Sequence, residues 1–254
     1  MPIARGRTHR RFDAISRIAW DLASRVEAAV LVALLLAALS LWAFIEIADE
    51  VLEGESLKFD ERIVLSLRRA ADPGTPVGPA WFNDAALEVT SLGSIAVLIL
   101  VVAAVLGYLA IRRLWGAFWL VLAASALGEI LNIVLKQAFA RPRPAVVPHL
   151  TDVQTLSFPS GHAMLSAIIY LTLGALLMRL ERQRRVKVYI LFIALTLTAL
   201  VGLSRVYLGV HYPTDILAGW SAGLAWATLC WLAARSLQRR GRVERSLDDR
   251  AAPD

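Results

Sequence analysis

Long apolar runs separated by short charged segments dominate this sequence. The first run has no charged residue between Glu27 and Glu46, and five further runs follow at 89–111, 114–135, 163–178, 188–204 and 216–234. A helix of about 20 apolar residues is long enough to cross the hydrocarbon core of a bilayer. The pattern therefore predicts an all-α fold, a six-span transmembrane helical bundle.

Composition supports a membrane protein over the other classes that a basic chain suggests. The 254 residues are 57% hydrophobic and 19% charged, with a formal charge of +6, and the mean hydropathy is +0.59. Soluble domains carry roughly a quarter charged residues. Because the basic residues cluster between apolar runs, membrane topology explains them, and we expect no nucleic-acid partner. The single Cys230 excludes an intrachain disulfide and a Cys-based metal site.

Three regions follow from the charge pattern: a basic N-terminus (1–27), a membrane domain (28–234) and a charged tail (235–254). A signal peptide is the competing interpretation of the first run. The apolar part of a signal peptide is usually about 7–15 residues, and a 27-residue lead is long, so we expect a retained span.

The connection at 46–88 is acidic and contains two local signals. Phe59, Ile63, Val64 and Leu67 recur at helical spacing, which predicts a short amphipathic helix that either lies at the bilayer interface or packs on the bundle. Asp72-Pro73-Gly74-Thr75-Pro76 is typical of a turn, and a further helical segment is expected from about Trp81, before the second span.

Basic segments fix the expected orientation. With six spans, the N-terminus, the Arg112-Arg113 turn, the segment 179–187 and the tail share one side, and these are strongly basic. The positive-inside rule places that side, with both termini, in the cytoplasm. We expect an integral protein of a bacterial inner membrane. The acidic connection and the loops 136–158 and 205–212 then face the periplasm or outside.

The third run carries polar residues on one helical face. Glu129, Asn132 and Lys136 follow the spacing i, i+3, i+7. An acidic residue within a span is expensive on insertion scales and is expected to face the bundle interior or water. Glu129 either supports a functional site or is a structural polar group.

The start of the fourth run is a candidate anion site. Pro159-Ser160-Gly161-His162 precedes an apolar helix, whose first N–H groups lack intrahelical partners and favour negative charge. Ser160 acting only as a helix cap is the simpler alternative. The same side of the membrane holds further polar groups: Lys136, Arg143, Arg205, His211 and Asp215. Arginine and lysine bind phosphate, and few carboxylates remain to hold a divalent ion. We therefore expect no metal.

The order of these residues resembles a known family. Lys136-x6-Arg143-Pro144, then Pro159-Ser160-Gly161-His162, then Ser204-Arg205-x5-His211-x3-Asp215 is similar to the motifs of the type 2 phosphatidic acid phosphatase (PAP2) family. This superfamily also includes vanadium haloperoxidases. The resemblance covers about residues 57–234. Arg141-Pro142 also occurs, but the spacing from Lys136 selects Arg143.

The resemblance implies roles for these residues. His211 is expected to be the nucleophile that forms a phosphohistidine, Asp215 its orienting partner, and His162 the general acid and base. The phosphate-binding groups would be Lys136, Arg143, Ser160, Gly161 and Arg205. Such an acid–nucleophile pair needs separated pKa values and predicts a bell-shaped pH profile. No metal or other cofactor is expected.

Together these observations predict a metal-independent phosphatase of membrane lipids. The expected substrates are phosphatidic acid, phosphatidylglycerol phosphate and polyprenyl diphosphates such as undecaprenyl pyrophosphate. A lipid phosphotransferase that uses the same intermediate is one alternative. A non-enzymatic transporter or anion-binding protein is another, although broken spans with mid-membrane charges and repeat symmetry, which favour a transporter, are not evident. The sequence does not indicate an oligomeric state.

Overall fold

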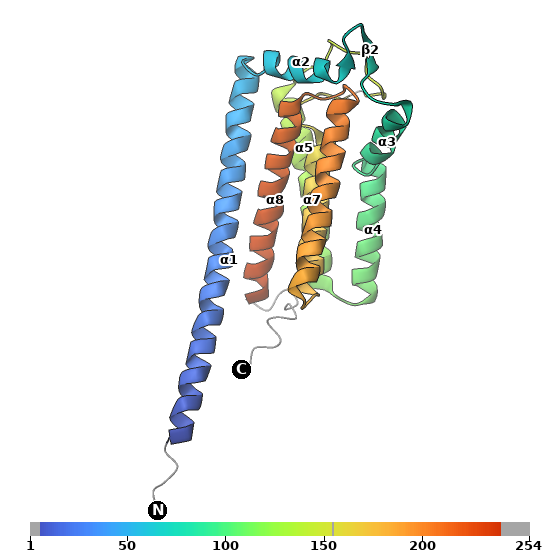
Figure 1. Ribbon diagram of the computed structural model, residues 1–254. Coiled ribbons are helices and arrows are strands. Elements are labelled where there is room, and N and C mark those ends of the chain that lie inside the picture. Colours follow the sequence, from blue (N-terminus) through green and yellow to red (C-terminus); the bar gives the residue numbers. More distant parts are fainter. Residues whose placement is uncertain (1–5, 154, 240–254) are drawn as a thin grey trace, which may run out of the picture.

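A computed structural model describes residues 6–153 and 155–239, with side chains between residues 28 and 238 (Figure 1). The described chain is mostly helical, as predicted, with one small antiparallel sheet of β1 and β2. The elements in order are α1 (Gly6–Glu53), α2 (Leu57–Ser66), β1 (Arg68–Arg69), β2 (Asp72–Pro76), α3 (Ala80–Ser91), α4 (Ile95–Ile111), α5 (Trp115–Phe139), α6 (Gly161–Arg179), α7 (Arg184–Tyr207) and α8 (Pro213–Arg239).

Five helices within the described residues are long and apolar enough to cross a membrane, namely α1, α5, α6, α7 and α8. Helices α3 and α4 reach this length only together, and they are bent by 46° at the break between them. Counted as one span, this pair brings the number to six. The six-span topology therefore remains a prediction.

The break between α3 and α4 corrects the prediction of a continuous helix over 89–111. Ser94 ends the break by capping α4, where its Oγ accepts a hydrogen bond from Val97 N at 3.4 Å. At Gly93, a Cβ atom would lie 2.3 Å from Val201 Cγ1 and 3.3 Å from His162 Cδ2. Only glycine allows the bend to approach α7 and the start of α6 this closely.

The bundle is organised around α8 and α6. Helix α1 runs along α8 and extends beyond the end of the bundle (Figure 1). Its 48 residues correspond to about 70 Å, so the helix begins well before the predicted span, within the region expected as a basic N-terminus. Helix α6 packs against both α7 and α8. The core at this contact includes Met164, Ile168 and Ala222.

The other spans are a few residues longer than their apolar runs. Helix α7 continues through Arg205 to Tyr207, so Arg205 lies in the last helical turn and not in a loop as expected. Helix α8 passes the predicted end at Ala234. The remaining tail, 240–254, and residues 1–5 lie outside the described residues.

A short helix and a hairpin cover one end of the bundle (Figure 1). The predicted amphipathic helix is confirmed as α2, with Val64 buried and Phe59 52% exposed. The turn expected at 72–76 is instead β2, paired with β1. The turn chemistry is present, because Asp72 Oδ1 accepts a hydrogen bond from Gly74 N at 2.9 Å, but the same backbone also pairs with Arg68 and Arg69.

Arg68 connects this hairpin to α7. Its buried guanidinium donates from Nη1 to Tyr207 O at 2.9 Å, where a cation is favoured by the partial negative charge of a helix C-terminus. Gly209 follows with φ +74°, and a Cβ atom there would lie 2.5 Å from Arg68 Nη2. Glycine therefore permits the turn from α7 towards α8.

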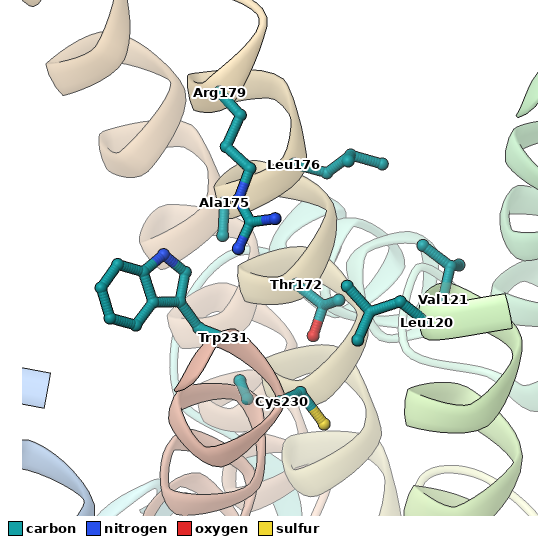
Figure 2. Close-up of a pocket in the computed structure, with 9 residues that line it drawn as sticks. Leu120, Val121, Thr172, Ala175, Leu176, Arg179, Cys230 and Trp231 are labelled. Atoms are coloured by element: carbon teal, nitrogen blue, oxygen red, sulfur yellow. The ribbon is translucent and has the colours of Figure 1, made fainter. Parts of the chain in front are cut away.

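A small pocket lies at the opposite end of the bundle, between α5, α6 and α8 (Figure 2). Thr172 and Arg179 of α6 and Cys230 of α8 line it with apolar neighbours. Its volume of about 10 Å³ is close to the minimum that holds one water molecule. Cys230 is partly buried there, as a packing residue.

Candidate active site

The three sequence motifs converge at the end of the bundle that α2 covers. Lys136 lies in the last turn of α5, Gly161 and His162 begin α6, and Arg205 lies in the last turn of α7. These residues line a cavity of about 540 Å³ together with Arg143 and His211. Its lining includes six of the eight predicted site residues: Lys136, Arg143, Gly161, His162, Arg205 and His211. The other two, Ser160 and Asp215, are fully buried behind this surface.

His211 presents one ring nitrogen to the cavity cations and the other to Asp215. Its Nε2 lies 3.1 Å from Arg143 Nη1, and its Nδ1 lies 3.3 Å from Asp215 Oδ2. A guanidinium has only donors, so Nε2 must accept this hydrogen bond. The geometry thus assigns the proton to Nδ1, which donates to Asp215, and leaves the Nε2 lone pair towards the cavity.

Burial keeps the His211 imidazole neutral. The residue is 1% exposed. This desolvation, aided by the charges of Arg143 and Arg205, lowers the pKa of His211 to about 3 against the opposing effect of Asp215. A neutral imidazole at pH 7 keeps a lone pair available for nucleophilic attack.

Asp215 is held by donors on both carboxylate oxygens. Its Oδ2 accepts hydrogen bonds from Tyr212 N at 2.8 Å and from the Ser157 hydroxyl, in addition to His211. Its Oδ1 accepts from Arg141 Nη1 at 2.7 Å. The carboxylate is therefore fixed in one orientation relative to the imidazole.

Lys136 and Arg143 organise the α5–α6 connection at the rim of the cavity. Lys136 Nζ donates to the carbonyl oxygens of Leu156 at 2.7 Å and Pro159 at 3.0 Å. Arg143 donates from Nε to Thr155 O at 2.7 Å and from Nη1 to Val210 O at 2.6 Å. Burial lowers the pKa of Arg143 to about 10, so the guanidinium is still charged at neutral pH.

Arg205 has the least satisfied donors of the three cations. Its Nη1 donates to Thr90 Oγ1 at 3.2 Å, while its Nε is buried with no hydrogen-bond partner among the described residues. Within that part of the chain, neither Arg205 nor the other two cavity cations forms a salt bridge. An anion in the cavity would supply the missing charge and acceptor atoms.

The start of α6 completes the cavity wall. Ser160 Oγ accepts a hydrogen bond from Ala163 N at 3.5 Å, so its side chain caps the helix, which was the simpler alternative. At Gly161, a Cβ atom would lie 3.2 Å from both amide atoms of Asn132. Glycine therefore lets the helix N-terminus, with its unpaired N–H groups, lie against α5 at the cavity. A phosphate-binding role for Ser160 stays a prediction.

His162 and the polar face of α5 line the same cavity. His162 makes no hydrogen bond within the described residues, and its ring lies close to the α3–α4 break at Gly93. Glu129 also lines the cavity and accepts a hydrogen bond from Asn132 Nδ2 at 3.2 Å. The face predicted from the spacing of Glu129, Asn132 and Lys136 is therefore confirmed.

Four polar residues that contact the buried side of the site were not among the candidates predicted from the sequence: Asp60, Arg141, Ser157 and Thr214. Arg143, selected by its spacing, does reach the cavity, whereas Arg141 lies behind it and contacts Asp215 and Asp60. Ser157 and Thr214, which contact the same network, lie within three residues of a motif residue, and this proximity is the available signal. Asp60 lies 81 positions before Arg141, in a segment without a motif.

Carboxylates and histidines are too dispersed to indicate a metal centre. Among the described residues, no group of three His, Cys, Asp or Glu side chains is arranged to hold a metal ion. That the reaction needs no metal stays a prediction.

The sequence is similar to those of known proteins. The sequence profile of the PAP2 superfamily matches residues 117–239, a range that contains all eight predicted site residues. Phosphatidylglycerophosphatase B of Bacillus subtilis is 38% identical over 146 residues, which cover 57% of this chain and 71% of the relative. An undecaprenyl-diphosphatase of Sulfolobus acidocaldarius is 32% identical over 119 residues, covering 45% and 49%.

A solved structure shares the fold of this chain. The crystal structure of a transmembrane PAP2 type phosphatidylglycerolphosphate phosphatase from Bacillus subtilis superposes with a TM-score of 0.70 and 28% identity, covering 80% of this chain and 98% of that chain. The fold, the sequence similarity and the apolar helices all indicate the same family of membrane proteins. The chain is an integral membrane phosphatase that belongs to the PAP2 superfamily.

Proposed function

We propose that this chain removes a phosphate group from a membrane lipid through a phosphohistidine on His211. The observation that carries the proposal is the His211 ring, neutral and buried, with its Nε2 lone pair directed at a cavity that three cations line. The relatives named as a phosphatidylglycerophosphatase and an undecaprenyl-diphosphatase support a lipid phosphate as substrate.

The cavity would bind the phosphoryl group by charge and by backbone donors. Lys136, Arg143 and Arg205 would neutralise its oxygens, and the N-terminus of α6 at Gly161 would donate N–H groups. Arg143 now occupies the His211 Nε2 lone pair. It would turn its donor to a phosphoryl oxygen when substrate binds, which frees the nucleophile.

In the first half-reaction, His211 Nε2 would attack phosphorus as the bond from phosphorus to the lipid oxygen breaks. His162, protonated, would give its proton to that oxygen, and the lipid alcohol (or lipid phosphate, for a diphosphate) would leave. The imidazole becomes positively charged, and Asp215 would stabilise this charge through the Nδ1–H hydrogen bond.

In the second half-reaction, neutral His162 would accept a proton from a water molecule as its oxygen attacks phosphorus. The P–N bond breaks, inorganic phosphate leaves, and His211 returns to its neutral state. His162 ends protonated, ready for the next cycle. His162 would thus be the acid of the first half-reaction and the base of the second, while His211 would be first the nucleophile and then the leaving group.

The cavity lining fits a lipid substrate. Besides its charged groups it includes apolar side chains of three helices, Ile95, Ile133 and Leu165. Acyl or prenyl chains could leave the phosphate site along this surface towards the bilayer. Phosphatidylglycerol phosphate, phosphatidic acid and polyprenyl diphosphates are the candidate substrates.

The cavity would face the extracytoplasmic side of a bacterial inner membrane. It lies at the end of the bundle opposite the basic Arg112-Arg113 turn and the loop after Arg179, which the positive-inside rule assigns to the cytoplasm. A cysteine at His149, in a Cys230→Ser background, should react with a membrane-impermeant maleimide added outside intact cells. Labelling only after cell lysis would contradict this orientation.

Phosphate release from a panel of lipid phosphates in detergent tests the activity. The purified wild-type chain should release phosphate, and His211→Ala and His162→Ala should lose nearly all of this activity. His149→Ala is the matched control, because His149 is an exposed histidine outside the cavity lining. Full activity in either of the first two variants would refute the mechanism.

A further inference from the structure

A buried network connects α2 to the His211–Asp215 pair, and it lies outside the cavity. Asp60 on α2 is fully buried, and its Oδ2 accepts a hydrogen bond from Arg141 Nη2 at 2.8 Å. The other terminal nitrogen of the same guanidinium, Nη1, donates to Asp215 Oδ1 at 2.7 Å. One arginine thus bridges two carboxylates that are 155 positions apart in the sequence.

Thr214 closes this network into a ring. Its hydroxyl accepts from Arg141 Nη1 at 2.8 Å and donates to Asp60 Oδ2 at 2.6 Å, while its backbone N donates to Asp60 Oδ1 at 3.1 Å. The Arg141 guanidinium also lies 4.4 Å from the centre of the Tyr212 ring. Thr214 lies beside Asp215 in the first turn of α8, and Tyr212 directly precedes this helix, so these contacts converge on its start.

Buried ion pairs of this kind seldom add much stability. Removing two charges from water carries a free-energy penalty that their mutual attraction only partly offsets. What the network does supply is orientation, because Arg141 holds Asp215 Oδ1 while Oδ2 faces His211. Without that bond, the carboxylate would be held through Oδ2 alone, by Tyr212 N, Ser157 and His211.

Charge balance requires Asp60 as well. Arg141 alone, directly beside Asp215, would cancel the negative charge that stabilises a positive imidazole at His211. Asp60 offsets Arg141, so the three groups Asp60, Arg141 and Asp215 together carry one net negative charge. The full negative charge of Asp215 thus remains effective at the nucleophile.

We propose that Asp60 and Arg141 are positioning residues, which fix the orientation and the charge of Asp215 and thereby prepare His211 for attack. This inference rests on the proposed phosphohistidine mechanism. It also gives α2 a function beyond packing, because the helix that lies across the end of the bundle (Figure 1) carries the outermost member of the network.

The test compares two inhibitors of the full-length enzyme in detergent. Orthovanadate adopts the five-coordinate geometry of the transition state and needs an aligned His211, whereas inorganic phosphate needs only the cationic cavity. The variants are Asp60→Asn, which removes the outer charge, and Arg141→Lys, whose single ammonium cannot bridge two carboxylates. Asp84→Asn on α3 and Arg69→Lys on β1 are the matched controls, because both side chains are exposed.

For each of the two variants we expect kcat to fall roughly 10- to 100-fold, the effect of small misplacements in an active site. The Ki for vanadate should rise by a similar factor, while KM and the Ki for phosphate should change less than about threefold, since ground-state binding is kept. In the double variant the losses should not multiply, because Asp60 acts through Arg141. The controls should match the wild type.

Three results separate the possible failures. If both Ki values rise together with a fall in Tm, the network is only structural and the inference is wrong. If kcat is unchanged in a folded Asp60→Asn or Arg141→Lys protein, the inference is also wrong, and Arg141→Lys decides if Asp60→Asn does not fold. If the wild type itself neither releases phosphate nor responds to vanadate, the proposed function fails instead.

Discussion

The lowered pKa of His211 predicts a specific loss of stability in mild acid. In the unfolded chain an imidazole has a pKa of about 6.5 and takes up a proton as the pH falls through that value. In the folded protein His211, with a pKa of about 3, stays neutral. Between pH 7 and pH 5 unfolding is therefore coupled to proton uptake, and the free energy of unfolding falls with pH.

The two pKa values give the size of this effect. The integrated linkage between pH 7 and pH 5 is about 2 kcal/mol, nearly all of it from the unfolded state. In a chain of this length 1 kcal/mol corresponds to about 2–4 °C in Tm. His211 alone should therefore lower the Tm by about 4–8 °C between pH 7 and pH 5.

The matched variant is His211→Asn, whose amide can still donate to Asp215 but does not titrate. Thermal unfolding of both proteins in one detergent, at one scan rate, gives the difference in Tm at each pH. All other groups, including Asp215, Arg143 and Arg205, remain in both proteins. The wild type should lose stability relative to the variant as the pH falls from 7 to 5. Parallel curves would show that His211 is not buried as a neutral base.

Three further predictions test the surroundings of the cavity. Gly93→Ala, with a Cβ 2.3 Å from Val201, should cost about 1–3 kcal/mol by overpacking and reduce kcat by displacing His162. Gly107→Ala, within α4, has open space around its Cβ and should leave kcat unchanged without lowering Tm. Arg205→Ala should lower kcat/KM roughly 100- to 1,000-fold, as loss of one transition-state donor does, and Arg69→Ala, on the exposed hairpin, is its control in the phosphate-release assay. Excess EDTA should leave phosphate release unchanged; activity that disappears with chelator and returns with Mg²⁺ would contradict a site that works by its own cations.

The residues that line the cavity were predictable from the spacing of the motifs along the chain. The spacing from Lys136 distinguished Arg143 from Arg141, and the structure agrees, since only Arg143 lines the cavity. The capping by Ser160 also follows from the residues beside it. Periodicity identified α2, but it could not show which polar residue of that helix would be buried.

Long-range contacts and backbone bends were the features that the sequence did not reveal. Asp60 meets Arg141 and Thr214 across 81 and 154 positions, and no local pattern encodes such a pairing. The break before Ser94 was missed because no charged residue interrupts the second run, although Ser91, Gly93 and Ser94 make the run locally less apolar. At the break, Gly93 lies so close to Val201 of α7 that no side chain fits, and this contact joins segments that are distant in sequence.

Trapping the covalent intermediate tests the central claim most directly. The enzyme is mixed with a lipid phosphate labelled with ³²P in the transferred group, quenched within milliseconds in base, and digested for mass spectrometry. The account predicts label on the peptide that carries His211, released by mild acid as a phosphohistidine is, and absent from His211→Asn. Label on another residue, or full turnover in His211→Asn, would contradict it.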